Sequence, residues 1–247
     1  MRIDLHNFFQ YYDPKNPKHV AAVEQLEVDL VGKSPDLMED TANWVKIFRT
    51  KLEVVIPGIL NVPYYPQTDN YRDANRTCNS SSCAMCLEYF KPGTLVGAKG
   101  DDAYVQKVFA VGDTTDHSVQ TKVLASYGVK SEFRYNLGFA DLDRELSAGR
   151  PVVIGILHRG TLSSPTGGHM LCVIGKSPDG KSYICNDPYG DLNDGYTGAV
   201  TNGKGAVYKK SDLQYRWLEN NKDKTRFVKK SFIFYHMRFS SCQNEFI

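Results

Sequence analysis

Apolar side chains over residues 1–56 recur with the spacing of amphipathic helices. Asn16–Pro17 supplies a helix cap followed by a proline at the first helical position, and Ser34–Pro35 repeats this signal before a second apolar stripe. Prolines and a glycine then interrupt the helical pattern, so we place a domain boundary near Gly58. We therefore expect residues 1–56 to form a helical segment whose apolar faces pack on a main domain spanning residues 57–247.

Within the main domain the pattern changes from helical to extended. Four segments have helical spacing: residues 78–90, 101–110, 116–127 and 139–148. From Pro151 onward, short β-branched runs separated by Gly, Pro and Asp predict strands over residues 151–157, 169–176, 181–187 and 229–239. The sequence SPDG between the second and third of these runs is typical of a hairpin turn. Helices followed by antiparallel strands predict an α+β fold.

The composition is that of an ordinary soluble protein, with 41% hydrophobic and 23% charged residues. A net charge of +2 gives no indication of a nucleic-acid partner. The sequence MRIDLHNFFQYYDPKNP carries charges and a proline where a signal peptide needs an apolar core, and no apolar run approaches the ~20 residues of a membrane helix. We expect no membrane insertion and a reducing cytoplasm, which disfavours disulfides unless the protein works outside the cell.

Three cysteines lie within the sequence NRTCNSSSCAMCLEYF. Cys78 falls where the predicted helix begins, and a helix N-terminus lowers the pKa of a thiol and activates it as a nucleophile. Cys83 and Cys86 lie deeper in the helix and look like small core residues. They also form a C-x-x-C pair, but a structural zinc site needs a second pair, and Cys172 and Cys185 lie in apolar strands. We expect Cys78 to be the reactive cysteine and expect no zinc.

A cysteine nucleophile needs a base, and the base needs a group that orients it. His169 follows two glycines and opens a predicted strand, while Asp187 ends the next strand along the chain. If SPDG closes a hairpin, the start of the first strand faces the end of its partner, so we expect His169 beside Asp187. Gln67 lies in a loop ahead of Cys78, where its amide is a candidate donor to the oxyanion of a tetrahedral intermediate.

Several stretches of the sequence resemble a known family. NVPYYPQ, TCNSSSCAM, GGHMLCVIGK and NDPYG are similar to the papain-like cysteine peptidases related to the bacteriocin-leader-processing peptidases. The family's nucleophile motif reads C-G-P-x-S-x-A-M, and Cys78 is followed at the matching positions by Ser82, Ala84 and Met85. Asn79–Ser80 stands where the family often has Gly-Pro. The resemblance covers roughly residues 57–247 and implies a papain-like fold, with a helix-borne nucleophile packed on an antiparallel sheet.

The resemblance also implies a role for each site residue. It selects Cys78 as nucleophile, His169 as base, Asp187 as the acid that orients His169, and Gln67 as the oxyanion residue, with no metal or organic cofactor. The stretches ANRTCNSSSCAMCLEYFKPG and VIGILHRGTLSSPTGGHM further resemble bacteriophage lysis or cell-wall-degrading proteins. That subgroup implies a substrate in the cross-bridge or stem peptide of peptidoglycan.

The expected function is therefore that of a phage-type endolysin, an endopeptidase or amidase. Such an enzyme would be made in the host bacterial cytoplasm and act on the cell wall after release. Two alternatives stay open, a protease that acts on a phage or host protein and a non-catalytic binding module with a papain-like cleft. The transporter-linked processing of leader peptides is disfavoured, because no membrane segment or nucleotide-binding motif is found.

Four other polar features have simpler interpretations. We expect His158 to be a loop residue on the rim of the cleft and His117 to be structural. Asp191 and Asn193 fit part of a calcium loop, but a turn with side-chain hydrogen bonds is the better account because the distal glutamate ligand is missing. The basic run 222–230 fits a solvated loop, with contact to an anionic wall polymer as the alternative.

Overall fold

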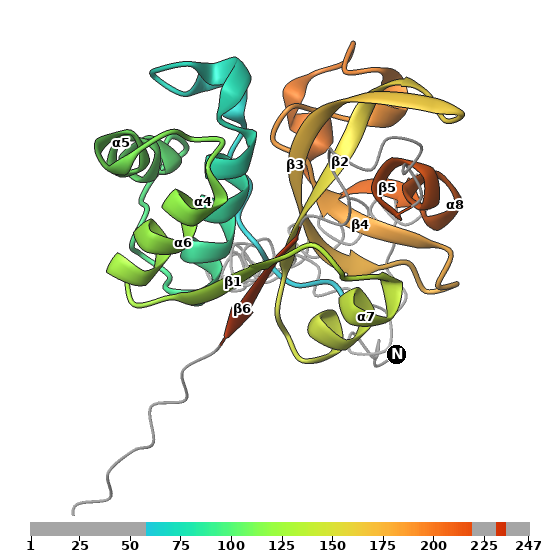
Figure 1. Ribbon diagram of the computed structural model, residues 1–247, viewed down its shortest axis with the longest axis horizontal. Coiled ribbons are helices and arrows are strands. Elements are labelled where there is room, and N and C mark those ends of the chain that lie inside the picture. Colours follow the sequence, from blue (N-terminus) through green and yellow to red (C-terminus); the bar gives the residue numbers. More distant parts are fainter. Residues whose placement is uncertain (1–57, 219–230, 236–247) are drawn as a thin grey trace, which may run out of the picture. The chain divides into compact units, whose positions relative to one another are not determined.

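The computed structural model describes residues 58–218 and 231–235, which belong to one compact unit of the chain, Val55–Ile247 (Figure 1). The predicted helical segment 1–56 and the basic run 222–230 lie outside these residues and stay predictions. None of the helices in the described ranges combines the length and the apolar character needed to cross a bilayer.

A six-stranded sheet forms the centre of the unit. Its strands follow the order β1-β6-β2-β3-β4-β5, and all neighbouring pairs are antiparallel. The bounds are Lys130–Arg134 (β1), Val152–Thr161 (β2), Ser164–Lys176 (β3), Ser182–Asn186 (β4), Ala206–Lys209 (β5) and Ser231–Tyr235 (β6). Strand β6 thus lies between β1 and β2, although it follows every other described element in the sequence.

The helices precede and interrupt the strands along the chain. They are α4 (Cys78–Phe90), α5 (Asp101–Val111), α6 (His117–Ser126), α7 (Phe139–Ser147) and the short α8 (Lys210–Leu213), which continues into a π-helical turn, η5 (Gln214–Leu218). Helix α6 begins where the Asp116 carboxylate accepts the Ser118 N–H at 2.7 Å. Short 3-10 turns complete the unit: η1 (Gln67–Asp69), η2 (Ala74–Arg76), η3 (Leu192–Asp194) and η4 (Val200–Gly203).

Helices cover both faces of the sheet. Helices α4 and α6 lie against one face with α5 packed on both of them, and α7 and α8 lie on the other side (Figure 1). Strand residues alternate between the two faces, as the two-residue period of a strand requires. Phe232 and Phe234 pack on the α4 side, whereas Ile233 between them packs with Leu171 and Trp217 on the other. The sheet is therefore buried on both faces and provides a rigid support.

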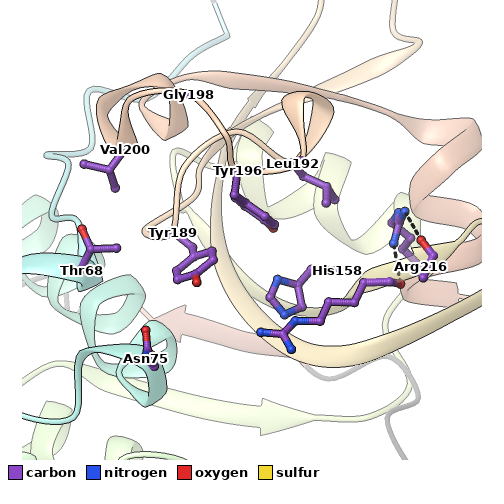
Figure 2. Close-up of a pocket in the computed structure, with 12 residues that line it drawn as sticks. Thr68, Asn75, His158, Tyr189, Leu192, Tyr196, Gly198, Val200 and Arg216 are labelled. Atoms are coloured by element: carbon purple, nitrogen blue, oxygen red, sulfur yellow. Dashed lines mark hydrogen bonds between the residues drawn. The ribbon is translucent and has the colours of Figure 1, made fainter.

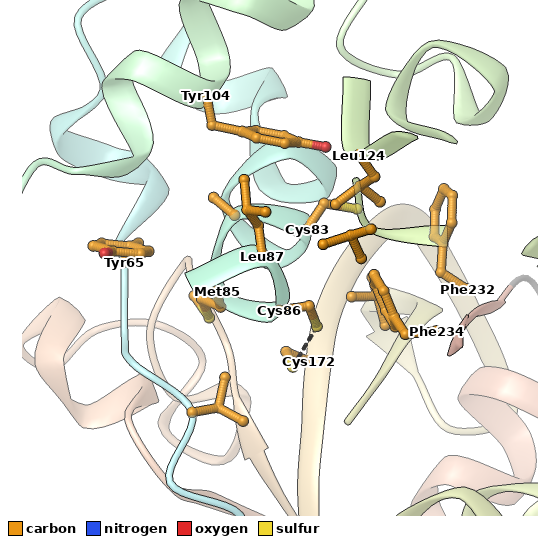
Figure 3. Packing of buried hydrophobic residues seen from close by; sticks show 14 of the residues in the cluster. Tyr65, Cys83, Met85, Cys86, Leu87, Tyr104, Leu124, Cys172, Phe232 and Phe234 are labelled. Carbon is orange, nitrogen blue, oxygen red and sulfur yellow. Dashed lines mark hydrogen bonds between the residues drawn. The ribbon is translucent and has the colours of Figure 1, made fainter. Parts of the chain in front are cut away.

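The core on the α4 side is built around the inner face of that helix (Figure 3). Cys83, Met85, Cys86 and Leu87 are each 0% exposed. Cys86 reaches the sheet, where its sulfur lies 3.5 Å from that of Cys172, and both are free thiols. The interpretation of Cys83 and Cys86 as core residues is confirmed. Cys78, at the other end of α4, is only partly buried.

Most predicted elements of the main domain are present. The four predicted helices match α4 to α7, and the four predicted strands match β2, β3, β4 and β6, although β2 and β3 extend further than expected. The SPDG sequence closes the β3–β4 hairpin, where the Gly180 N–H donates to the Ser177 carbonyl at 2.8 Å. The α+β class, with the Cys78 helix packed on an antiparallel sheet, is confirmed. Strands β1 and β5 and helix α8 were not predicted.

Candidate active site

Cys78 is the first residue of α4, so its thiol lies at the positive end of the helix dipole. The start of this helix is fixed by polar contacts that do not involve the thiol. Asn70 donates from its side-chain amide to Thr77 Oγ1 at 2.8 Å and to Ser81 Oγ at 2.9 Å. Ser81 in turn donates to the buried carboxylate of Asp101 at 2.7 Å. The backbone around Cys78 is therefore held independently of its sulfur.

His169 and Asp187 meet at the open end of the β3–β4 hairpin, as the hairpin turn predicts. His169 lies on β3 and Asp187 directly follows β4, and the two side chains are 3% and 0% exposed. The distance from His169 Nε2 to Asp187 Oδ1 is 2.6 Å. The predicted contact between these two residues is confirmed, and it leaves the second ring nitrogen, Nδ1, available for another partner.

Hydrogen-bond donors surround the carboxylate of Asp187. The Oδ1 atom also accepts the backbone N–H of Tyr189 at 2.9 Å. The Oδ2 atom accepts the hydroxyls of Tyr208 at 2.9 Å and Tyr196 at 3.4 Å. Burial and the charge of Asp187 raise the pKa of both tyrosines, so both stay protonated donors. Both oxygens of the carboxylate are thus satisfied, and its orientation toward His169 is fixed.

These tyrosines are site residues that the sequence analysis missed. Tyr208 lies on β5, which pairs with β4, and Tyr196 lies in the loop between them. The short alternating run AVYK was the available signal for β5. Tyr64 also contributes, because its hydroxyl donates to the Asp187 backbone carbonyl at 2.9 Å. On the other side of Asp187, its backbone N–H donates to the Gly203 carbonyl at 2.9 Å.

The pKa of His169 reflects three opposing effects. Burial is the largest and lowers the pKa, because it penalises the cationic ring. The charge of Asp187 and its hydrogen bond act in the other direction, as do a hydrogen bond and charge interaction with the Cys78 thiol, and together they raise the pKa to about 10. Cys78 is therefore a partner of the same ring that Asp187 orients. The structure brings Cys78, His169 and Asp187 together.

Gln67 lies between the Asp187 segment and the turn that enters α4. Its backbone N–H donates to the Pro188 carbonyl at 2.8 Å, and its side-chain Nε2 donates to the Ala74 carbonyl at 2.7 Å. The side-chain oxygen is buried and has no partner among the described residues. A glutamine amide carries two N–H donors, so one remains beyond the bond to Ala74. The residue is thus anchored close to the start of the Cys78 helix.

The expectation for His158 was wrong in part. The residue lies on strand β2, not in a loop, and its ring stacks on that of His169 with 4.8 Å between centroids and 21° between planes. The pairing of β2 with β3 causes this, because it sets the ends of the two strands side by side. His117 begins α6 and stacks on Phe133 at 3.7 Å, in keeping with a structural role.

The DLND segment forms a turn with internal hydrogen bonds. The carboxylate of Asp191 accepts the backbone N–H of Asn193 at 2.9 Å and its side-chain amide at 2.8 Å. This is the alternative that the sequence favoured over a calcium loop. Among residues 58–218 and 231–235, no group of three or more His, Cys, Asp and Glu side chains is arranged to hold a metal ion.

A cavity of about 730 Å³ opens beside the segments that carry the candidate site residues (Figure 2). Its lining includes residues close to each of Gln67, Cys78, His169 and Asp187. Thr68 directly follows Gln67, and Asn75, in η2, lies shortly before Cys78 in the sequence. His158 stacks on His169, and Tyr189 lies shortly after Asp187. In Figure 2, Thr68 and Asn75 lie on the opposite side of the cavity from His158. The cavity therefore lies next to the segments that carry the candidate site residues.

The chain was compared with solved structures and with known sequences. Among the similar solved structures, two are matched over most of their own length. One is a Bacillus anthracis protein described as a C39-like peptidase, with 14% identity, a TM-score of 0.49, and coverage of 72% of this chain and 96% of that one. The other is a double-glycine motif protease from an AMS/PCAT transporter in complex with the leader peptide, with 17% identity, a TM-score of 0.44, and coverage of 73% and 95%.

Sequence comparison is more decisive than these distant structural likenesses. None of the curated proteins matches the chain. The family described as Peptidase_C39 like matches residues 59–224, which is most of the chain and includes Gln67, Cys78, His169 and Asp187. The helix that carries Cys78 and the antiparallel sheet that carries His169 agree with the papain-like fold expected of such a peptidase. The chain therefore belongs to the Peptidase_C39 like family.

Proposed function

We propose that this protein is a cysteine peptidase that hydrolyses amide bonds with Cys78, His169, Asp187 and Gln67. One observation carries the proposal: a single buried imidazole contacts Asp187 at 2.6 Å through Nε2 and also interacts with the thiol of Cys78. A nucleophile, a base and an orienting acid in this relation are the requirement for thiol catalysis. Family membership supports the same reaction class.

The steps follow from the position of each group. The thiolate of Cys78 attacks the amide carbonyl carbon, and the oxyanion accepts hydrogen bonds from the Cys78 N–H and the Gln67 amide. His169 donates its proton to the leaving amine, and a thioester with Cys78 remains. His169 then takes a proton from water, whose oxygen attacks the thioester and releases the acid and the thiol. Asp187 keeps the proton of Nε2 in place throughout.

For the substrate we propose a peptide of peptidoglycan, cleaved by a phage-type endolysin. The support is the resemblance of the segments around Cys78 and His169 to phage lysis proteins, and the cavity beside them has room for a peptide. Purified sacculi should be incubated with the protein, and the released fragments identified by mass spectrometry. Release of new amino and carboxyl termini by the wild type but not by Cys78→Ala is expected. A protein substrate is favoured instead if sacculi stay intact while peptide pools are cleaved.

The rate of alkylation distinguishes between two functions for this protein, a peptidase and a non-catalytic binding module with the same fold. A Cys78 thiolate paired with the His169 imidazolium should react with iodoacetamide at mildly acidic pH, where ordinary thiols are protonated. Cys83 and Cys86 are fully buried and serve as internal controls in the same digest. Modification of Cys78 should be faster than that of a free cysteine peptide. Equal or slower modification would favour the binding module.

The pH profile of kcat/KM should be bell-shaped, with an alkaline limb near pH 10. His169 must hold a proton to protonate the leaving amine, and its pKa is raised to about 10, so activity is lost as the pH rises through that value. The two limbs belong to the coupled Cys78–His169 pair and to neither residue alone. Because Asp187 raises this pKa, Asp187→Asn should move the alkaline limb to lower pH. An unchanged limb in that variant would contradict the assignment.

A further inference from the structure

Positive charge dominates the wall of the cavity beside the candidate active site. The 12 lining residues include Arg159 and Arg216 but no aspartate or glutamate. The Arg216 guanidinium donates to the carbonyl oxygens of Leu157 at 2.7 Å, Arg159 at 3.3 Å and Gly160 at 3.4 Å, all at the end of β2. Carbonyl groups fix the side chain but do not cancel its charge. Arg216 is labelled at one end of the view in Figure 2.

The second cation, Arg159, is exposed, and its guanidinium makes no hydrogen bond or ion pair with any described residue. Its aliphatic carbons lie beside Gly167 on the neighbouring strand β3, which supports the stem of the side chain. A guanidinium that lines a cavity without an acidic partner retains all five N–H donors. It is therefore available to a ligand.

The other residues near the cavity do not cancel the positive charge of Arg159 and Arg216. The pKa of His158 is lowered to about 4, first because the ring is removed from water and then because His169, Arg159 and Arg216 disfavour another cation nearby, and these effects outweigh the opposite effect of the Asp187 carboxylate. The carboxylates of Asp191 and Asp194 are close in sequence to lining residues but do not line the cavity. Asp191 accepts both hydrogen bonds from Asn193, and the carboxylate of Asp194 lies beside Gly198, as does the side-chain amide of Asn202. The cavity thus holds two permanent cations that no lining residue neutralises.

We propose that this cavity binds a carboxylate of the peptide substrate, carried by an aspartate, a glutamate or a free peptide terminus close to the scissile amide, and that Arg159 is its main ligand. A guanidinium matches a carboxylate with two parallel N–H···O bonds, which gives direction as well as attraction. The rings of Tyr189 and Tyr196 line the same cavity (Figure 2). This inference rests on the proposed function, since it assigns the substrate preference of the same site.

The test uses two pools of internally quenched peptides that differ only in charge. One pool contains Asp and Glu at randomised positions, and the matched pool contains Asn and Gln at those positions. The wild type should cleave the acidic pool with a kcat/KM at least about tenfold higher, the size expected of one charge-assisted hydrogen bond. Arg159→Gln should remove that preference by raising the KM of the acidic pool toward that of the neutral pool. Arg159→Lys should restore part of the preference for the acidic pool, because lysine supplies the positive charge but cannot make the two parallel hydrogen bonds of a guanidinium.

The control is Arg144→Gln, which removes an exposed arginine on α7 that does not line the cavity. It should behave as the wild type with both pools. Equal cleavage of the two pools by the wild type, or a preference that survives in Arg159→Gln, would overturn the carboxylate subsite while leaving the peptidase intact.

A binding measurement separates failure of the subsite from failure of the proposed function. The Cys78→Ala variant, with and without Arg159→Gln, is mixed with both pools, and the retained peptides are identified by mass spectrometry. Retention of acidic peptides that depends on Arg159 supports the subsite even if the wild type cleaves neither pool. Indifference to charge in this measurement, together with no cleavage, would remove both proposals.

Discussion

Replacement of Cys78 by alanine should abolish peptide cleavage while the protein stays folded. Removal of a catalytic nucleophile lowers kcat by roughly 10⁴-fold or more. The fold should survive because the sulfur is partly exposed and the start of α4 is held by Asn70, Thr77 and Ser81. Cleavage of the peptide pools measures the first effect, and the melting temperature with the circular dichroism spectrum measures the second.

Two neighbouring cysteines provide the matched controls. Cys83→Ala and Cys86→Ala each remove one fully buried sulfur from the core, so both should remain active but lose roughly 1 kcal/mol of unfolding free energy. The reverse pattern, an inactive Cys83→Ala and an active Cys78→Ala, would show that the motif has been aligned to the wrong cysteine.

Asp187→Asn should lower kcat/KM by roughly 10²-fold or more with little change in fold. The amide has nearly the shape of the carboxylate, and its oxygen can still accept from His169 Nε2 and the Tyr189 N–H. Its NH₂ group can donate to the Tyr208 hydroxyl, which rotates to accept. What is lost is the negative charge that stabilises the imidazolium and fixes its tautomer. Asp187→Ala should cost at least as much, because it also leaves those donors without a partner.

The control for this variant is Asp143→Asn on α7. Asp143 also accepts a tyrosine hydroxyl, from Tyr183 at 2.8 Å, and it contacts Lys176 at 2.9 Å, but it lies away from the cavity. Its replacement should leave kcat/KM unchanged. Full activity in Asp187→Asn at all pH values would mean that His169 needs no orienting acid.

The parts of the site that were predictable are those with local signals. The helix start at Cys78 and the hairpin turn between β3 and β4 are encoded within a few residues, and the hairpin places the start of β3, with His169, near Asp187 at the end of β4. The tyrosines were not predictable, because Tyr196 and Tyr208 reach Asp187 only after β5 pairs with β4. The stack of His158 on His169 likewise depends on the exact pairing of β2 with β3. Such contacts depend on tertiary structure, which the periodicity of hydrophobic residues in the sequence does not predict.

The position of β6 has a consequence for how the protein is made. Strands β1 and β2 each pair with β6, so neither has its full set of neighbours until that strand has left the ribosome. During synthesis the chain therefore presents two open strand edges, which are prone to pairing with other chains. The hairpin that carries His169 and Asp187 is complete earlier, but the sheet supporting it is not. The sheet around the candidate active site therefore stays incompletely assembled until translation has passed β6.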